Sequence, residues 1–343
     1  MINQLHPYLY KKIRLTKRAK IFLNYIVGPL LFIWLSWAIY KQIQAQTDLE
    51  QSWQTILNAL NGSNKWMIGL VILLMLVNWG IEARKWQIQV KGIEQLSLLY
   101  AFKSILAGQA MGFTTINRIG EPLARAAFLK DGNRIRGAVL SIVGSMAQII
   151  VTFVLGAAAL IYMRWNILDG EHQLEGLSIF WLDALIYVIG MGILLFTLAY
   201  FKLAGLIQLV ERIPFVRKYQ FFLEKLEEFH WNELLRLLSL SLVRYLVFLL
   251  QYYLLLQVFD IHVFWLDAFA MVGVMLTLLA IIPTTALAEL GIRGKMSLLV
   301  LGLISTNSLG IIATAAGIWL INLILPAIAG TLVILGVRLF RNK

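Results

Sequence analysis

The sequence predicts an all-α, polytopic membrane protein with about eight spanning helices and one re-entrant segment. Of its 343 residues, 60% are hydrophobic and 14% are charged, whereas a soluble domain carries about 25% charged residues. Several apolar runs also exceed the roughly 18 residues that are typical of a spanning helix. The chain is therefore predicted to be a multi-pass protein of the cell membrane.

Composition also excludes several kinds of chemistry. The chain has no cysteine, which excludes disulfides and thiolate catalysis. Its histidines are far apart in sequence and show no metal-ligand spacing: His6, His172, His230 and His262. The net charge of +12 is explained by basic cytoplasmic loops and anionic lipid headgroups. We therefore expect no cofactor, no metal and no nucleic-acid partner, and the sequence leaves the oligomeric state open.

The predicted spans follow one another along a single transmembrane domain, 21–343, after a basic cytoplasmic N-terminus, 1–20. The apolar runs are 21–40, 66–83, 137–163, 179–203, 238–258, 265–283, 289–306 and 309–337. An amphipathic stretch, 204–237, joins the two halves, 21–203 and 238–337. The first 20 residues hold six basic side chains and no acid, which places the N-terminus in the cytoplasm. Eight spans return the basic C-terminus to the same side.

A ninth apolar segment, 96–116, has an ambiguous path. The segments on both sides of it, 84–96 and 117–136, are basic and are therefore predicted to be cytoplasmic. The segment must then dip into the membrane and return, or lie along its surface. Gly108 and Gly112 have the spacing that lets two backbones approach closely, and they also permit a break in the helix.

Two stretches are predicted to be amphipathic surface helices. In 47–60, Leu49, Trp53 and Leu60 share one helical face with other apolar residues, which favours a helix in the outer headgroup layer. The stretch 204–236 mixes apolar and charged residues. It is predicted to form two interfacial helices on the cytoplasmic side.

The turn after 96–116 brings charges into an apolar region. It reads GFTTINRIGEPLARAAFLK over 112–130. Pro122 suits the first turn of a helix, so a helix is predicted from near Glu121 to about Lys130, preceded by Gly120. Its N-terminus would favour an anion. Arg118 lies just before this helix, and Arg125 follows Glu121 at the favourable i,i+4 spacing.

A similar turn occurs late in the chain, over 281–296. Glu289 and Arg293 repeat the Glu-x-x-x-Arg spacing, Pro283 interrupts the preceding apolar run, and Gly291 loosens the following one. Paired broken segments in two halves of a chain are typical of transport sites built from discontinuous helices. Two short similar segments are equally compatible with an inverted internal repeat and with two unrelated turns.

The charges of these turns have two interpretations. In the first, each turn holds a local Glu–Arg pair at the cytoplasmic interface, worth a few tenths of a kcal/mol. In the second, both turns face one polar cavity, where Arg118, Arg125 and Arg293 bind a phosphate, and Glu121 and Glu289 hold the arginines in place or contact a cationic headgroup. Elsewhere, Arg84 and Lys85 are predicted to snorkel to the interface, and Arg244 either snorkels or reaches the cavity.

At these turns the sequence resembles the membrane region of lysylphosphatidylglycerol synthases, which represents a wider family of flippase-like membrane proteins. The family's Arg-x-Gly-Glu-x-x-x-Arg signature reads Arg118-Ile119-Gly120-Glu121-Pro122-Leu123-Ala124-Arg125 here. Its second signature, a late Pro and a Gly-rich turn, is matched by Pro283 and Gly291-Ile292-Arg293, while Gly294 replaces a common Glu. The resemblance implies re-entrant segments, lipid-headgroup binding and movement of lipids between leaflets.

The leading hypothesis is a lipid flippase or lipid transporter that binds a phosphate-bearing phospholipid or lipid-linked headgroup in a cavity lined by the two broken helices. The synthases add a soluble aminoacyl-transfer domain after this region, and the sequence ends at Lys343, so we do not expect an enzyme. A membrane-embedded glycosyl- or acyltransferase is one alternative, although the charged turns lack an Asp-x-Asp motif. A small-solute transporter is another, and it predicts a cavity closed off from lipid. With no Walker motif, transport would be driven by a gradient, by the membrane potential or by consumption of the lipid.

Overall fold

The computed structural model describes residues 65–113, 115, 118–168, 179–210, 220–282 and 286–336, together with Gln54 and Gly62. The regular structure in these ranges is helical. The predicted span 21–40, nearly all of the amphipathic stretch 47–60 and both termini lie outside the described residues. Pro283 also lies outside them, and so does the side chain of Glu289.

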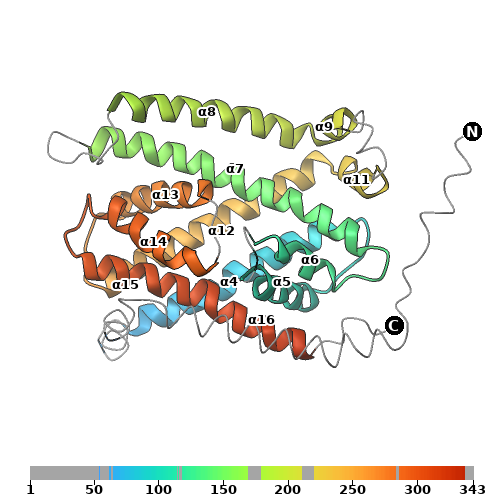
Figure 1. Ribbon diagram of the computed structural model, residues 1–343, viewed down its shortest axis with the longest axis horizontal. Coiled ribbons are helices and arrows are strands. Elements are labelled where there is room, and N and C mark those ends of the chain that lie inside the picture. The colour runs from blue at the N-terminus through green and yellow to red at the C-terminus, as the bar shows by residue number, and fades with distance from the viewer. Residues whose placement is uncertain are drawn as a thin grey trace, which may run out of the picture.

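Four described helices are long and apolar enough to cross a membrane. They are α4 (Lys65–Val90), α7 (Arg134–Asn166), α8 (Ile179–Phe201) and the continuous rod of α15 (Ser308–Trp319), η3 (Leu320–Ile324) and α16 (Leu325–Gly336). A fifth long helix, α12 (Trp231–Val258), runs between them (Figure 1). These helices contain the predicted spans 66–83, 137–163 and 238–258 and closely match 179–203 and 309–337, so the multi-pass architecture is confirmed.

The long helices form because their backbone polar groups must be satisfied internally in lipid, where no water is available. α8 illustrates the outcome: most of its side chains are apolar, and Phe180, Trp181, Tyr187 and Leu195 are largely exposed. In water such a face would be unfavourable, but against lipid tails it costs nothing. The exposed apolar surface of this protein is therefore its lipid-facing surface.

A short hairpin of helices lies between α4 and α7. It consists of α5 (Leu98–Phe113) and α6 (Gly120–Ala126). The loop that enters it and the loop that leaves it touch: the Glu94 carboxylate accepts a hydrogen bond from the Lys130 backbone N–H at 2.9 Å, and Asn133 Nδ2 donates to the Ile93 carbonyl at 3.2 Å. The segment therefore starts and ends at the same end of the molecule, which is the re-entrant path.

A second hairpin, of α13 (Trp265–Ile281) and α14 (Ala286–Leu301), enters from the opposite end (Figure 1). Asn307 Nδ2 donates to the Phe259 carbonyl at 3.1 Å, so this hairpin also returns to its starting end. Its helices have 17 and 16 residues, or about 25 Å each, which is less than the roughly 30 Å of a bilayer core. The structure thus differs from the prediction of two full spans at 265–283 and 289–306.

The two hairpins pack in equivalent ways. α5 packs against α16, α13 packs against α7, and α4 packs against α12. These pairings match an inverted repeat in which α4 to α7 correspond to α12 to α16, with one hairpin entering from each end. α9 (Leu203–Val210) and α11 (Gln220–Glu227), which pack against each other, lie in the predicted amphipathic connection between the halves.

Small residues allow the hairpin helices to approach closely. A Cβ atom added to Gly108 would lie 2.9 Å from Arg125 Cγ, and one added to Gly112 would lie 3.2 Å from Glu121 Cβ. The Gly108–Gly112 spacing was predicted to let two backbones approach closely, and the structure shows that α6 is the segment that approaches there. On the other side of α5, a Cβ atom on Gly330 would lie 1.9 Å from the Leu106 carbonyl oxygen, so α16 touches the α5 backbone.

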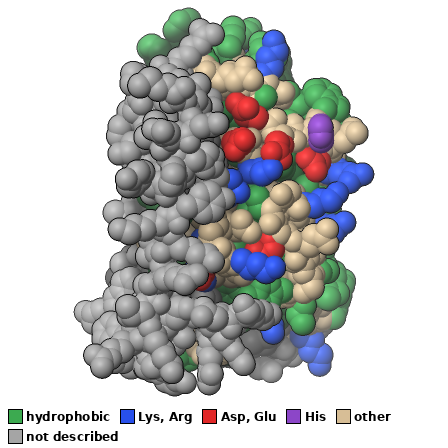
Figure 2. Space-filling view, turned by 90° about the vertical axis from the view of Figure 1, so that its right-hand side faces the viewer, with side chains coloured by type: hydrophobic (Ala, Val, Ile, Leu, Met, Phe, Trp, Pro, Cys, Tyr) green, Lys and Arg blue, Asp and Glu red, His purple; other side chains and the backbone are tan. Residues whose placement is uncertain are grey.

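Charged side chains gather at one end of the molecule. Figure 2 views the end at which α4 finishes and α12 begins, and its described part carries Lys, Arg, Asp, Glu and His side chains. Basic residues in the loops and helix ends there are Arg84, Lys91, Lys130, Arg134, Arg136, Lys202, Lys225 and Arg236, whereas Lys65 and Arg164 lie at the opposite helix ends. This asymmetry follows the pattern of basic cytoplasmic loops.

Candidate functional site

Six charged residues form one network where the first hairpin meets α4 and α12. We call them the charged cluster: Glu82, Lys85, Arg118, Glu121, Arg125 and Arg244. They come from α4, from α6 with the turn before it, and from α12. The cluster therefore joins the hairpin to both halves of the fold.

Glu82 is the centre of this network, and only 5% of the residue is exposed. Its Oε1 atom lies 2.8 Å from Arg125 Nη1. Its Oε2 atom lies 3.0 Å from Arg244 Nη1 and 3.3 Å from Lys85 Nζ. Three cations thus share one buried carboxylate, and removing that carboxylate would leave them without their common counter-ion.

Glu121 is the second acid of the cluster. Its Oε1 atom accepts hydrogen bonds from Arg125 Nη2 and, at 2.8 Å, from Gln109 Nε2. Its Oε2 atom lies 3.2 Å from Arg118 Nε, and Arg118 also donates to Gln109 Oε1. The i,i+4 pair of Glu121 and Arg125 that the sequence predicted is therefore present, as part of a larger network.

The turn before α6 aims Arg118 at this network. Arg118 has φ 59°, a left-handed conformation that is uncommon for a residue with a side chain. The Gly120 N–H donates to Thr115 Oγ1 at 2.9 Å, and a Cβ atom on Gly120 would lie 2.9 Å from the Met111 carbonyl oxygen. Only glycine fits this position, so the Arg-x-Gly-Glu sequence is explained by the geometry of the turn.

α6 is shorter than predicted. It begins at Gly120, contains Pro122 in its first turn and ends at Ala126 rather than near Lys130. A helix of seven residues aligns few peptide dipoles. The predicted helix terminus therefore contributes little positive charge, and the cationic groups of this region are the arginine side chains.

Three residues of the cluster, Glu82, Lys85 and Arg244, were not assigned to it from the sequence. Lys85 was predicted to snorkel, but the residue is 1% exposed and donates to the Gly144 carbonyl at 3.3 Å. Arg244, left between snorkelling and the cavity, turns inward: its Nε atom donates to Asn78 Oδ1 at 2.7 Å and its guanidinium lies over the Trp79 ring. Glu82 was overlooked as the partner of both. Its opposite charge at i,i+3 from Lys85 was the available signal.

The second charged turn is placed differently. Arg293 Nη1 donates to the hydroxyl of Tyr252 on α12 at 2.7 Å. Gly291, predicted as a helix break, lies within the continuous helix α14. The tips of the hairpins meet in an apolar cluster that contains Phe113 of α5 and Leu290 of α14. Glu289 cannot be assigned to the site because its side chain lies outside the described residues.

The accessible side of the charged cluster is cationic. The Arg118 and Arg244 side chains are 36% and 22% exposed, whereas those of Glu121 and Glu82 are 15% and 7% exposed. The cluster contains four cations and two anions, a net charge of +2. An incoming group therefore meets guanidinium groups first, which suit a carboxylate or phosphate.

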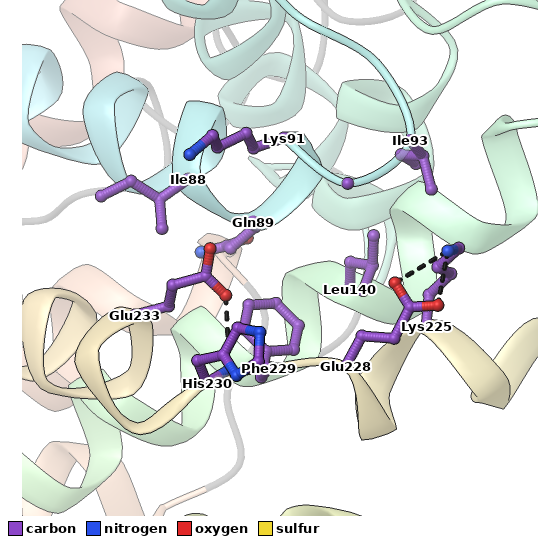
Figure 3. A pocket seen from close by; sticks show the side chains of 11 residues that line it. Ile88, Gln89, Lys91, Ile93, Leu140, Lys225, Glu228, Phe229, His230 and Glu233 are labelled. Atoms are coloured by element: carbon purple, nitrogen blue, oxygen red, sulfur yellow. Dashed lines mark hydrogen bonds and ion pairs between the residues drawn. The ribbon is translucent and has the colours of Figure 1, made fainter.

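A separate open pocket of about 240 Å³ lies at the charged end of the molecule (Figure 3). Charged residues in its lining are held locally: Lys225 Nζ lies 2.5 and 2.8 Å from the two Glu228 carboxylate oxygens, and Glu233 accepts from the His230 backbone N–H at 3.4 Å. Within the described ranges, no group of three or more His, Cys, Asp or Glu is arranged to hold a metal ion.

The chain is similar to a known protein family. The family model described as the lysylphosphatidylglycerol synthase TM region matches residues 23–330, which is most of the chain. A search of curated proteins found no match. The matched range contains both hairpins, the charged cluster and the pocket.

Proposed function

The chain belongs to the lysylphosphatidylglycerol synthase TM-region family, and on that premise we propose that it is a lipid transporter. In this proposal, the charged cluster binds the anionic, phosphate-bearing headgroup of a lipid whose tails remain in the bilayer. The family name connects this multi-pass membrane protein with lipid chemistry. Headgroup binding and movement between leaflets are our own inference.

One observation carries the proposal: the charged cluster has excess positive charge at the tip of a re-entrant hairpin, between the two halves of the fold. Charged side chains within a membrane cost about 2.5 to 3.5 kcal/mol each on insertion scales. Two local ion pairs at the interface would not require Lys85 and Arg125 to be buried. A site that binds an anion gives this buried excess of cations a function.

The inverted arrangement of the hairpins supports a transport role. One hairpin enters from each end, and their tips share the apolar cluster of Phe113 and Leu290. In transporters with inverted repeats, the site lies between the repeats and one repeat moves against the other. We assign the charged end seen in Figure 2 to the cytoplasm, and we propose from the basic residues of the sequence that both termini are cytoplasmic as well. A gradient, the membrane potential or consumption of the lipid would drive net movement.

The test is a leaflet-resolved transport assay with two fluorescent anionic phospholipids, phosphatidylglycerol and phosphatidic acid, in reconstituted vesicles. Arg118→Gln and Arg244→Gln each remove a partly exposed cation of the cluster. Because a hydrogen bond to a charged group is worth about 1.5–3 kcal/mol, each variant should slow transport about tenfold or more. Arg84→Gln is the matched control, since Arg84 lies on α4 but is exposed and bonded to Gln87. If both cluster variants transport at the wild-type rate, the assigned site is wrong.

A further inference from the structure

The charged cluster also indicates which class of headgroup it takes. We propose that the bound group is a phosphate monoester at the end of a lipid, a dianion at neutral pH, in preference to a phosphodiester or a headgroup with an amine. This inference rests on the proposed function and narrows its substrate. Three properties of the cluster lead to it.

The first property is that both acids are already paired within the cluster. The two Glu82 oxygens bind Arg125, Arg244 and Lys85. The two Glu121 oxygens bind Arg125, Gln109 and Arg118. Every carboxylate oxygen of the cluster already has a hydrogen bond or an ion pair within this chain. A headgroup ammonium would have to compete with these cations for the same two carboxylates, so an amine-bearing lipid is disfavoured.

The second property is the charge balance. The cluster carries a net charge of +2, and its centre is buried, where opposite charges interact more strongly than in water. A phosphate monoester carries about −1.5 to −2 at pH 7, which balances the cluster. A phosphodiester carries one negative charge and leaves one positive charge of the cluster unbalanced. A zwitterionic headgroup adds no net charge. The monoester is therefore the phosphate class that best neutralises this site.

The third property is the arrangement of the accessible cations. Arg118 precedes α6 and Arg244 lies on α12, so two partly exposed guanidinium groups come from different elements. A guanidinium carries five N–H donors, so each can bond a phosphate in addition to its partners in the cluster. A monoester offers three terminal oxygens, whereas a diester offers two. Two guanidinium groups from separate segments of the chain suit the group with more free oxygens.

The experiment measures binding of three lipids with identical tails to the purified protein: phosphatidic acid, phosphatidylglycerol and phosphatidylethanolamine. Phosphatidic acid should bind about tenfold more tightly than phosphatidylglycerol, because its additional free oxygen accepts one more hydrogen bond from a charged donor. Phosphatidylethanolamine should bind most weakly. Lowering the pH from about 7.5 to about 5.5 protonates a monoester, whose second pKa is about 6. It should therefore weaken phosphatidic acid binding and leave phosphatidylglycerol binding unchanged.

Variants and a competitor separate the outcomes. Arg244→Gln should reduce the preference for phosphatidic acid over phosphatidylglycerol, and Arg84→Gln should preserve it. Equal affinities for these two lipids, with transport intact, would overturn the monoester assignment and leave the proposed function standing. Transport by the wild type of none of the three lipids would overturn the proposed function itself. Displacement of phosphatidic acid by inorganic phosphate at equal concentration would show a site for free phosphate, and would overturn the assignment to a lipid.

Discussion

Glu94, in the loop between α4 and α5, accepts a hydrogen bond from the backbone N–H of Lys130, 2.9 Å away in the loop between α6 and α7. This contact joins the two ends of the first hairpin. Asn307 and the Phe259 carbonyl make the corresponding contact at the other end of the molecule. Together these contacts fix a topology in which each hairpin returns to the end of the molecule from which it enters.

The topology can be tested by cysteine labelling, because the chain has no cysteine of its own. Lys91→Cys and Asp131→Cys, on the two sides of the first hairpin, should react with a membrane-impermeant maleimide from the same side. His262→Cys and Thr306→Cys, on the two sides of the second hairpin, should react from the opposite side. Labelling of Lys91→Cys and Asp131→Cys from different sides would mean that the α5–α6 segment crosses the membrane.

Replacing the central carboxylate should destabilise the fold. Glu82→Gln leaves Arg125, Arg244 and Lys85 without their shared counter-ion, and breaking a buried ion pair costs about 3–5 kcal/mol. The expected result is a large drop in the thermal unfolding midpoint in detergent. Glu224→Gln, at an exposed position of α11, should leave the midpoint nearly unchanged. A Glu82→Gln protein as stable as the Glu224→Gln control would contradict the central role of Glu82.

The contact of α16 with α5 should not tolerate a methyl group. In Gly330→Ala the new Cβ atom would lie 1.9 Å from the Leu106 carbonyl oxygen, so the helices must separate, at a cost of about 1–3 kcal/mol. Gly69→Ala is the control, since nothing lies within 4 Å of its Cβ position and alanine favours a helix. The thermal unfolding midpoint in detergent should be lower for Gly330→Ala than for the wild type. For Gly69→Ala it should equal or exceed that of the wild type. The reverse order would show that α16 does not touch α5 in this way.

The bond between Arg293 and Tyr252 should contribute to the packing of α14 on α12. Tyr252 is fully buried, and Tyr252→Phe removes only the hydroxyl that accepts from Arg293. A hydrogen bond to a charged group is worth about 1.5–3 kcal/mol, so this variant should unfold at a lower temperature. Tyr187→Phe, at a 79% exposed position, is the matched control. Equal unfolding midpoints for the two variants would rule out a stabilising role for this bond.

Local spacing explains what the sequence predicted about the site. Glu121 and Arg125 lie one helical turn apart, so their pairing follows from the pitch of the helix alone. Gly108 and Gly112 likewise mark the face of α5 that α6 approaches. The apolar runs also predict most of the long helices, because a chain in lipid must satisfy its backbone hydrogen bonds within each helix.

Other features depend on contacts between distant segments. Arg244 and Glu82 are 162 positions apart in the chain, and nothing in either neighbourhood specifies the other. Lys85 is a long basic side chain near a helix end, which predicts snorkelling. Instead it is buried, and it donates to the Gly144 carbonyl of α7. The segments 265–283 and 289–306 are apolar enough to span a membrane. However, α13 and α14 are each shorter than a bilayer core is thick, and they pack as a hairpin inside the fold.

The amino-acid sequence by itself determined that this protein lies in the membrane, where its long helices run, and that a glycine-containing turn carries Arg118, Glu121 and Arg125. Hydrophobicity and helical periodicity act over a few residues, so they can be read directly from the chain. Only the tertiary structure decided that Glu82 gathers three cations and that the hairpins enter from opposite ends. Those outcomes depend on which helices pack together, and that is settled by the shape and burial of the whole fold.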